Sequence, residues 1–149
     1  MAIHLHHDSK IDLLSGLALF EGLNHKQLGE IASLTTEIEV PAGRVLCEQG
    51  DHGEELFVII QGEVSIIIDG NEVAKLGPGN FFGEMALIDG GVRIAGAKAA
   101  TDASLLVLSR PEFRTLISDV PALAVPILEA VGKRLRENAA RKGDTPFGI

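Results

Sequence analysis

The chain has 149 residues, a formal net charge of −8 and 46% hydrophobic residues. This size and composition predict one domain with a sizeable core and disfavour disorder as the main state. The negative charge disfavours direct DNA binding. The absence of tryptophan and tyrosine removes the usual stacking platforms for single-stranded nucleic acid.

Two further features bear on location and metal binding. The clearest apolar runs, residues 56–60 and 105–108, are far too short to cross a bilayer, and the N-terminus lacks the pattern of a signal peptide. We therefore expect a cytoplasmic protein with no membrane contact. The single cysteine, Cys47, excludes an intrachain disulfide and is expected to be a buried structural thiol. The cluster His4, His6, His7 and Asp8 is a weak metal signal, and we expect no metal site.

The first of three regions, residues 9–34, carries leucines and isoleucines at helical spacing. Asn24 is a good N-cap for a helix that begins near His25 and turns Leu28 and Ile31 to one side. We expect two short helices on either side of the turn at residues 20–23.

The second region, residues 35–109, is punctuated by glycines and rich in short runs of Val, Ile and Leu. Asp69-Gly70 lies between two such runs and predicts a hairpin. Many short strands with frequent turns indicate a β-sandwich or roll rather than a parallel α/β sheet. The expected strands are Glu37–Val40, Arg44–Cys47, Leu56–Ile60, Val64–Ile68, Glu72–Leu76, Ser104–Leu108 and a segment after Arg93.

The third region, residues 110–142, is predicted to hold two helices, followed by a tail over residues 143–149. Ser109 and Glu112 have the spacing of a capping box for the first helix, and residues 119–121 end it. The second helix is expected to carry a short heptad-like stripe, and Pro126 should lie in its first turn. The stripe consists of Ala124, Leu128, Val131 and Leu135.

The segment from Phe82 to Arg93 is the best candidate for a binding site. A short helix beginning after Gly83 would direct the backbone N–H groups of Glu84, Met85 and Ala86 at one point, which suits an anion. Arg93 could return from the following loop and bind phosphate oxygens in a bidentate manner. The Glu84 carboxylate could accept a hydrogen bond from a sugar hydroxyl.

Several stretches of the sequence, with their glycines at the same places, resemble the cyclic nucleotide-binding domain family. That family occurs in the catabolite activator protein, in regulatory subunits of the cAMP-dependent protein kinase and in cyclic-nucleotide-gated channels. The stretches are Leu19 to Leu23, Gly50-Asp51, Leu56 to Val64 and Leu76 to Leu87. The resemblance covers nearly the whole chain. It implies an eight-stranded, double-sheet β-roll (jelly roll) in one domain over residues 9–142, with N-terminal helices, a short phosphate-cassette helix and C-terminal helices.

The resemblance also implies a role for each matching residue. Glu84 would bind the ribose 2′-hydroxyl and Arg93 would neutralise the cyclic phosphate. The ligand-binding set would comprise Gly83, Glu84, Met85, Ala86, Arg93, Ile94 and Ala95. Ile94 is bulkier than the family's usual residue, and Gly96 lacks a hydroxyl that often lies near the ligand.

These implications define a non-catalytic sensor that binds cAMP or, as the alternative ligand, cGMP, and needs no cofactor. Arg134, Leu135 and Asn138 of the last helix are the candidate lid residues. The same helix could pair two subunits or contact an unknown effector protein. Two alternatives stay open: a degenerate domain that only mediates protein interaction or dimerisation, and part of a transcription regulator without its DNA-binding domain.

Overall fold

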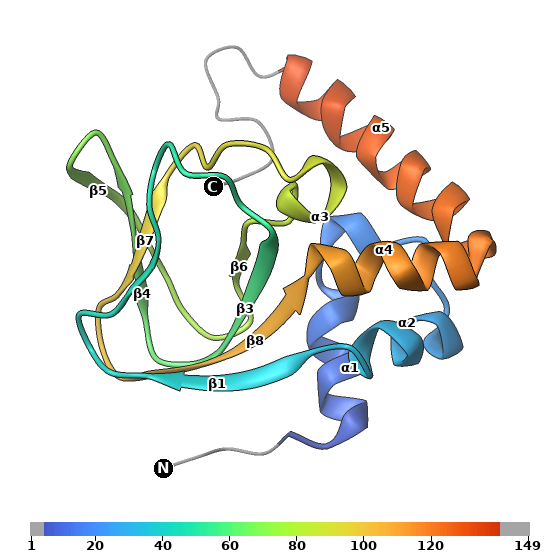
Figure 1. Cartoon of the computed structure of the whole chain (residues 1–149), viewed down its shortest axis with the longest axis horizontal. Coiled ribbons are helices and arrows are strands. Elements are labelled where there is room, and N and C mark those ends of the chain that lie inside the picture. Colours follow the sequence, from blue (N-terminus) through green and yellow to red (C-terminus); the bar gives the residue numbers. More distant parts are fainter. Residues whose placement is uncertain (1–4, 141–149) are drawn as a thin grey trace.

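Two four-stranded antiparallel sheets form the centre of the computed structural model, which describes residues 5–140 (Figure 1). One sheet has the strand order β1-β8-β3-β6 and the other has the order β2-β7-β4-β5. The predicted eight-stranded double-sheet roll is therefore confirmed. The strands are β1 (Thr36–Val40), β2 (Val45–Cys47), β3 (Glu55–Gln61), β4 (Val64–Ile68), β5 (Asn71–Leu76), β6 (Phe81–Phe82), β7 (Gly96–Ala99) and β8 (Ala103–Ser109).

The hairpin between β4 and β5 forms where the sequence predicts it. Asp69 and Gly70 both have positive φ, at 52° and 80°, and Ile68 pairs with Asn71 across the turn. Two successive residues with positive φ match the right-handed twist of the strands that they join. Strand β6, in contrast, was not predicted. It pairs with Phe57 and Val58 but has only two residues, and so short a strand shows no periodicity.

Helices lie mainly on one side of the roll (Figure 1). Their bounds are α1 (His7–Ser15), η1 (Ala18–Phe20), α2 (His25–Ala32), α3 (Ala86–Asp89), α4 (Arg110–Asp119), η2 (Pro121–Leu123) and α5 (Ala124–Ala140). Among them, α1 begins earlier than the expected Ser9, and the short helix η1 was not predicted. Among the described residues, no single helix is long and apolar enough to cross a membrane. One pair of helical segments, α4 and residues 121–137, reaches the length and hydropathy of a membrane span when taken together, but the pair is bent by 110°.

The predicted N-cap of α2 and the predicted capping box of α4 have opposite outcomes. At α2 Asn24 is the N-cap and a full capping box forms, because the Gln27 N–H donates to Asn24 Oδ1 at 2.8 Å and the Asn24 N–H donates to Gln27 Oε1 at 3.0 Å. At α4 the prediction is wrong, since the Ser109 hydroxyl donates to Glu112 Oε1 at 2.8 Å instead of accepting a backbone N–H. The helix still begins at Arg110, and Pro111 in its first turn needs no N–H partner.

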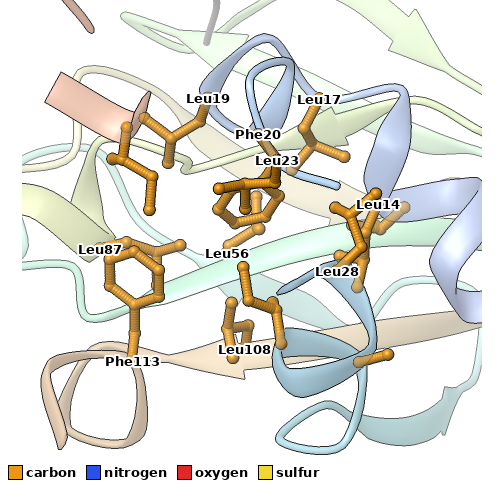
Figure 2. Packing of buried hydrophobic residues seen from close by; sticks show 14 of the residues in the cluster. Leu14, Leu17, Leu19, Phe20, Leu23, Leu28, Leu56, Leu87, Leu108 and Phe113 are labelled. Carbon is orange, nitrogen blue, oxygen red and sulfur yellow. The ribbon is translucent and has the colours of Figure 1, made fainter. Parts of the chain in front are cut away.

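The first sheet is apolar on both faces and so supports two cores. Leu56 and Leu108 on one face pack against the helices, whereas Phe57 and Leu105 on the other face point into the roll. Figure 2 shows the helix-side cluster, in which Leu87 of α3 lies near Phe113 of α4. The alternation follows the two-residue period of a strand, so this sheet separates the interior of the roll from the helical layer.

Helix α5 places the residues of the predicted heptad-like stripe in different surroundings, with Val131 packed against the core. Its inward face consists of Ile127 and Ala130, which are buried together with Leu123 just before the helix. Leu128 and Leu135 are 65% and 51% exposed. The helix carries apolar residues on two faces, and hydrophobic periodicity alone cannot tell which face meets the core. Pro126 lies in the first turn of the helix, as predicted.

Candidate functional site

A cavity of about 220 Å³ opens between the segment around α3 and the inner face of the second sheet. Its walls include every residue of the predicted ligand-binding set: Gly83, Glu84, Met85, Ala86, Arg93, Ile94 and Ala95. The carboxylate of Glu84 and the guanidinium of Arg93 therefore share one cavity, although α3 and a loop separate them along the chain.

The turn before α3 differs in one respect from the prediction. Gly83 has φ of 81°, a conformation that favours glycine, and it allows the chain to turn directly into the cavity wall. The helix itself begins only at Ala86, whose N–H already donates to the Gly83 carbonyl at 3.0 Å. The expectation of a free N–H group at Ala86 is therefore wrong. A helix of four residues also contributes little macrodipole.

Glu84 is a buried carboxylate in the wall of this cavity, with only 3% of its surface exposed. A carboxylate removed from water needs hydrogen-bond donors or a positive charge nearby. Since an ionised carboxylate can only accept hydrogen bonds, Glu84 suits a ligand that presents hydroxyl groups.

Arg93 is the complementary feature, a buried guanidinium that is 8% exposed. Its Nη2 donates to the Glu55 carbonyl at 2.9 Å, and its Cζ lies 5.9 Å from the centre of the Phe57 ring. Within residues 5–140, no carboxylate lies within the 4.0 Å that defines an ion pair with this guanidinium. A buried cation in a cavity wall without such a counter-ion favours an anionic ligand.

Cys47 was expected to be a buried structural thiol, but it is half-buried and lines the cavity. Its Sγ lies 3.8 Å from the Ala95 carbonyl. Burial raises the pKa of the Cys47 thiol, and the nearby positive charge of Arg93 opposes this shift with a smaller effect. The thiol is therefore protonated at neutral pH, which makes it a neutral part of the wall.

Phe82 is a wall residue that the sequence-based site did not include. Its ring stacks on Phe57, with 4.9 Å between ring centres and 13° between ring planes. It contributes an apolar surface to the cavity, next to Gly83. Its position in β6 directly before Gly83 was the available signal, and the alternation of a two-residue strand is too short to reveal it.

Leu135 is the candidate lid residue whose side chain is described, and it does not line the cavity. Leu135 is half exposed, and no described residue of α5 lines the cavity. The helix lies instead against the turn after η1, where a Cβ added at Gly22 would lie 3.0 Å from Pro126 Cβ. The side chains of Arg134 and Asn138 are outside the described residues.

No metal centre is evident in the part of the chain that the structure describes. Within that part, no three His, Cys, Asp or Glu side chains are grouped so that they could hold a metal ion. His4 lies outside the described residues.

Comparison with known proteins now assigns the fold and cavity to a class. The family described as "Cyclic nucleotide-binding domain" matches residues 37–119, which is more than half of the chain and includes the whole cavity wall. The chain belongs to this family.

Individual relatives come from channels and regulators. The chain is 40% identical over 122 residues to a cyclic nucleotide-gated potassium channel of Rhizobium etli, and 36% identical over 129 residues to a cyclic AMP receptor protein of Thermus thermophilus. These alignments cover 82% and 83% of this chain but only 34% and 60% of the relatives. The chain thus matches only part of the length of each.

A solved structure agrees with this assignment. The N-terminal domain of a transcriptional regulator from Streptomyces coelicolor A3(2) aligns with a TM-score of 0.79 and 32% identity. The alignment covers 90% of this chain and 99% of that domain. The similarity therefore extends through the roll and most of its flanking helices.

Proposed function

We propose that this protein is a non-catalytic sensor that binds a cyclic nucleotide in the cavity bounded by Glu84 and Arg93. The observation that carries the proposal is the burial of these two opposite charges in the wall of one cavity. A cyclic nucleotide presents one anionic phosphodiester and one free ribose hydroxyl. Arg93 would neutralise the phosphate with paired N–H donors, and Glu84 would accept the hydrogen bond of the 2′-hydroxyl.

We propose cAMP as the ligand, with cGMP as the alternative. The side chains of Ile94 and Ala95 at the cavity wall offer no hydrogen-bond acceptor, and Gly96 beside them has no side chain. A guanine amino group buried there without an acceptor would lose free energy relative to water, whereas the corresponding edge of adenine carries no such donor. The name of the Thermus relative, a cyclic AMP receptor protein, supports the same choice.

Occupancy of the cavity would be relayed through the C-terminal helices. Leu87 of α3 is buried in the same cluster as Phe113 of α4 (Figure 2), and Ile127 of α5 belongs to that cluster too. Gly90 at the end of α3 also packs closely on Arg110, because a Cβ there would lie 3.2 Å from the guanidinium carbon. A movement of α3 on ligand binding would therefore shift the packing of α4. We propose that residues 9–142 form one domain that responds in this way.

The partner surface would be the outward face of α5, where Leu128 and Leu135 are exposed two helical turns apart. Apolar residues at this spacing suit a second copy of the same helix. We propose a homodimer through α5 as the main assembly, an effector protein as a further partner, and no direct DNA contact by these residues. Sedimentation velocity of the wild type and of Leu128→Ala/Leu135→Ala tests the assembly. Equal association of both proteins would contradict it.

Isothermal titration calorimetry with cAMP, cGMP and linear 5′-AMP tests the ligand directly. We expect cAMP to bind more tightly than cGMP, and 5′-AMP to bind weakly, because its dianionic phosphate does not match a single buried arginine. Mass spectrometry of the purified protein would identify any retained nucleotide. The absence of heat from both cyclic nucleotides at millimolar concentration would contradict the sensor proposal. It would favour a domain that only dimerises, for which the exposed α5 face is the supporting observation.

A further inference from the structure

The Arg93 side chain occupies a slot between two glycines from different parts of the chain. A Cβ atom added at Gly53 would lie 2.6 Å from Arg93 Cζ and 2.8 Å from Cδ. A Cβ added at Gly83 would overlap Arg93 Nη1 and lie 2.7 Å from the Glu55 carbonyl oxygen. Real Cβ atoms essentially never approach other heavy atoms this closely, so the guanidinium can lie here only because both residues lack a side chain.

The two glycines are required for different reasons. Gly83 has φ of 81°, so its backbone alone favours glycine. Gly53 has no such φ, and the atoms nearest to its added Cβ all belong to Arg93. The position of the arginine, rather than local backbone strain, therefore excludes a side chain at residue 53.

Two further groups fix the guanidinium in the slot. The Glu55 carbonyl accepts a hydrogen bond from Nη2, and the Phe57 ring lies under Cζ and is held by its stack on Phe82. The backbone is tied in the same place. The Gly53 N–H donates to the Gly91 carbonyl at 2.9 Å, and the Arg93 N–H donates to the Asp51 carbonyl at 2.7 Å.

We propose that Gly53, which lies outside the cavity wall, is a positioning residue for nucleotide binding. It holds the Arg93 guanidinium in the orientation that the cyclic phosphate requires, so that the long side chain is ordered before the ligand arrives. Ordering during folding removes an entropic cost that binding would otherwise carry. This inference rests on the proposed function, because it assigns Gly53 a role in that same site.

A double-mutant cycle with Gly53→Ala and Arg93→Ala tests the proposal by cAMP calorimetry. We expect Gly53→Ala to weaken binding about ten-fold in the wild type and to have no further effect when Arg93→Ala is present. Gly77→Ala is the matched control, because Gly77 has no positive φ and nothing lies within 4 Å of its added Cβ. It should bind like the wild type. Unchanged affinity of Gly53→Ala, or an equal loss in both backgrounds, would overturn the proposal.

A second readout needs no nucleotide. The side-chain Nε–H resonance of Arg93, assigned by its loss in Arg93→Ala, should be protected from solvent exchange in the wild type and in Gly77→Ala. It should shift and lose protection in Gly53→Ala. If no nucleotide binds the wild type, the proposed function fails, while this signal still decides whether the slot holds the arginine. If Gly53→Ala does not fold, Phe57→Leu replaces it in both experiments, with an expected loss of about three-fold that again depends on Arg93.

Discussion

The cavity and helix α5 differ in which side chains they bury and which they expose. In the cavity, two charged residues, Glu84 and Arg93, are almost fully buried. On α5, two large apolar residues, Leu128 and Leu135, are more than half exposed. Burial of charge and exposure of apolar surface both have a free-energy cost in isolation. Under the proposed function, a small anion would complete the cavity and a protein surface would cover the outward face of α5.

The largest expected effect separates the buried contact of α3 from the exposed face of α5. Leu87→Ala removes a side chain that is 1% exposed and should lower the free energy of unfolding by about 2–5 kcal/mol. Leu128→Ala removes the same atoms from the surface and should change it by less than about 0.5 kcal/mol. Urea denaturation of both variants at low protein concentration measures the difference. Equal destabilisation would show that α5 is packed on both faces in solution.

The role of Glu84 can be tested with a matched change in the ligand. Glu84→Gln should weaken cAMP binding about ten-fold, because a charge-assisted hydrogen bond to the ribose hydroxyl is replaced by a neutral one. Removal of that hydroxyl in 2′-deoxy-cAMP should cost the wild type a similar factor but cost Glu84→Gln much less. Glu72→Gln on the exposed strand β5 is the control. If the losses of affinity from Glu84→Gln and from removal of the 2′-hydroxyl were additive, the ribose would not contact Glu84.

Cys47 offers a probe of the cavity because it is the chain's single cysteine and lines the wall. Bound nucleotide should slow its alkylation by iodoacetamide several-fold. Thiolate is the reactive form, and burial raises the pKa of this thiol, so the rate should continue to rise above the pH at which an exposed thiol is fully ionised. Mass spectrometry across a pH series measures both effects. Equal rates with and without saturating cAMP would place the ligand elsewhere.

The smallest expected effect concerns the ion pair between α5 and the turn after η1. Lys133 Nζ lies 3.5 Å from Glu21 Oε2, with side chains 63% and 44% exposed. Exposed pairs contribute little, so Lys133→Ala should change the free energy of unfolding by about 0.5 kcal/mol or less. Lys75→Ala, at an exposed position on β5, serves as the control. A loss of several times this size would contradict the expectation, because it would show that the ion pair is needed to hold α5 against the rest of the protein.

The parts of the fold that local chemistry determines could be predicted from the sequence. The N-cap at Asn24 and the hairpin turn at Asp69-Gly70 each depend on residues within four positions, and both predictions are confirmed. Ser109 and Glu112 also have capping spacing, but their side chains bond to each other instead. Local spacing therefore shows which contacts are available and not which one is made.

The parts that depend on distant packing could not be predicted. The chemistry of Glu84 and Arg93 singled them out and the resemblance assigned their roles, whereas Gly53 was missed because its requirement for glycine comes from a side chain forty positions later. The buried face of α5 was not predicted for a related reason, since both of its apolar faces satisfy helical periodicity and only packing against the rest of the protein selects Ile127 and Ala130.

The central claim is that an anionic cyclic nucleotide binds beside Arg93, and calorimetry of cAMP with Arg93→Ala and Arg114→Ala tests it most directly. Arg114 is an exposed arginine on α4, away from the cavity, so its variant makes the same chemical change without touching the site. We predict that Arg93→Ala weakens binding about ten- to a hundred-fold and that Arg114→Ala binds like the wild type. Equal affinity of all three proteins, or no binding by the wild type, would contradict the account.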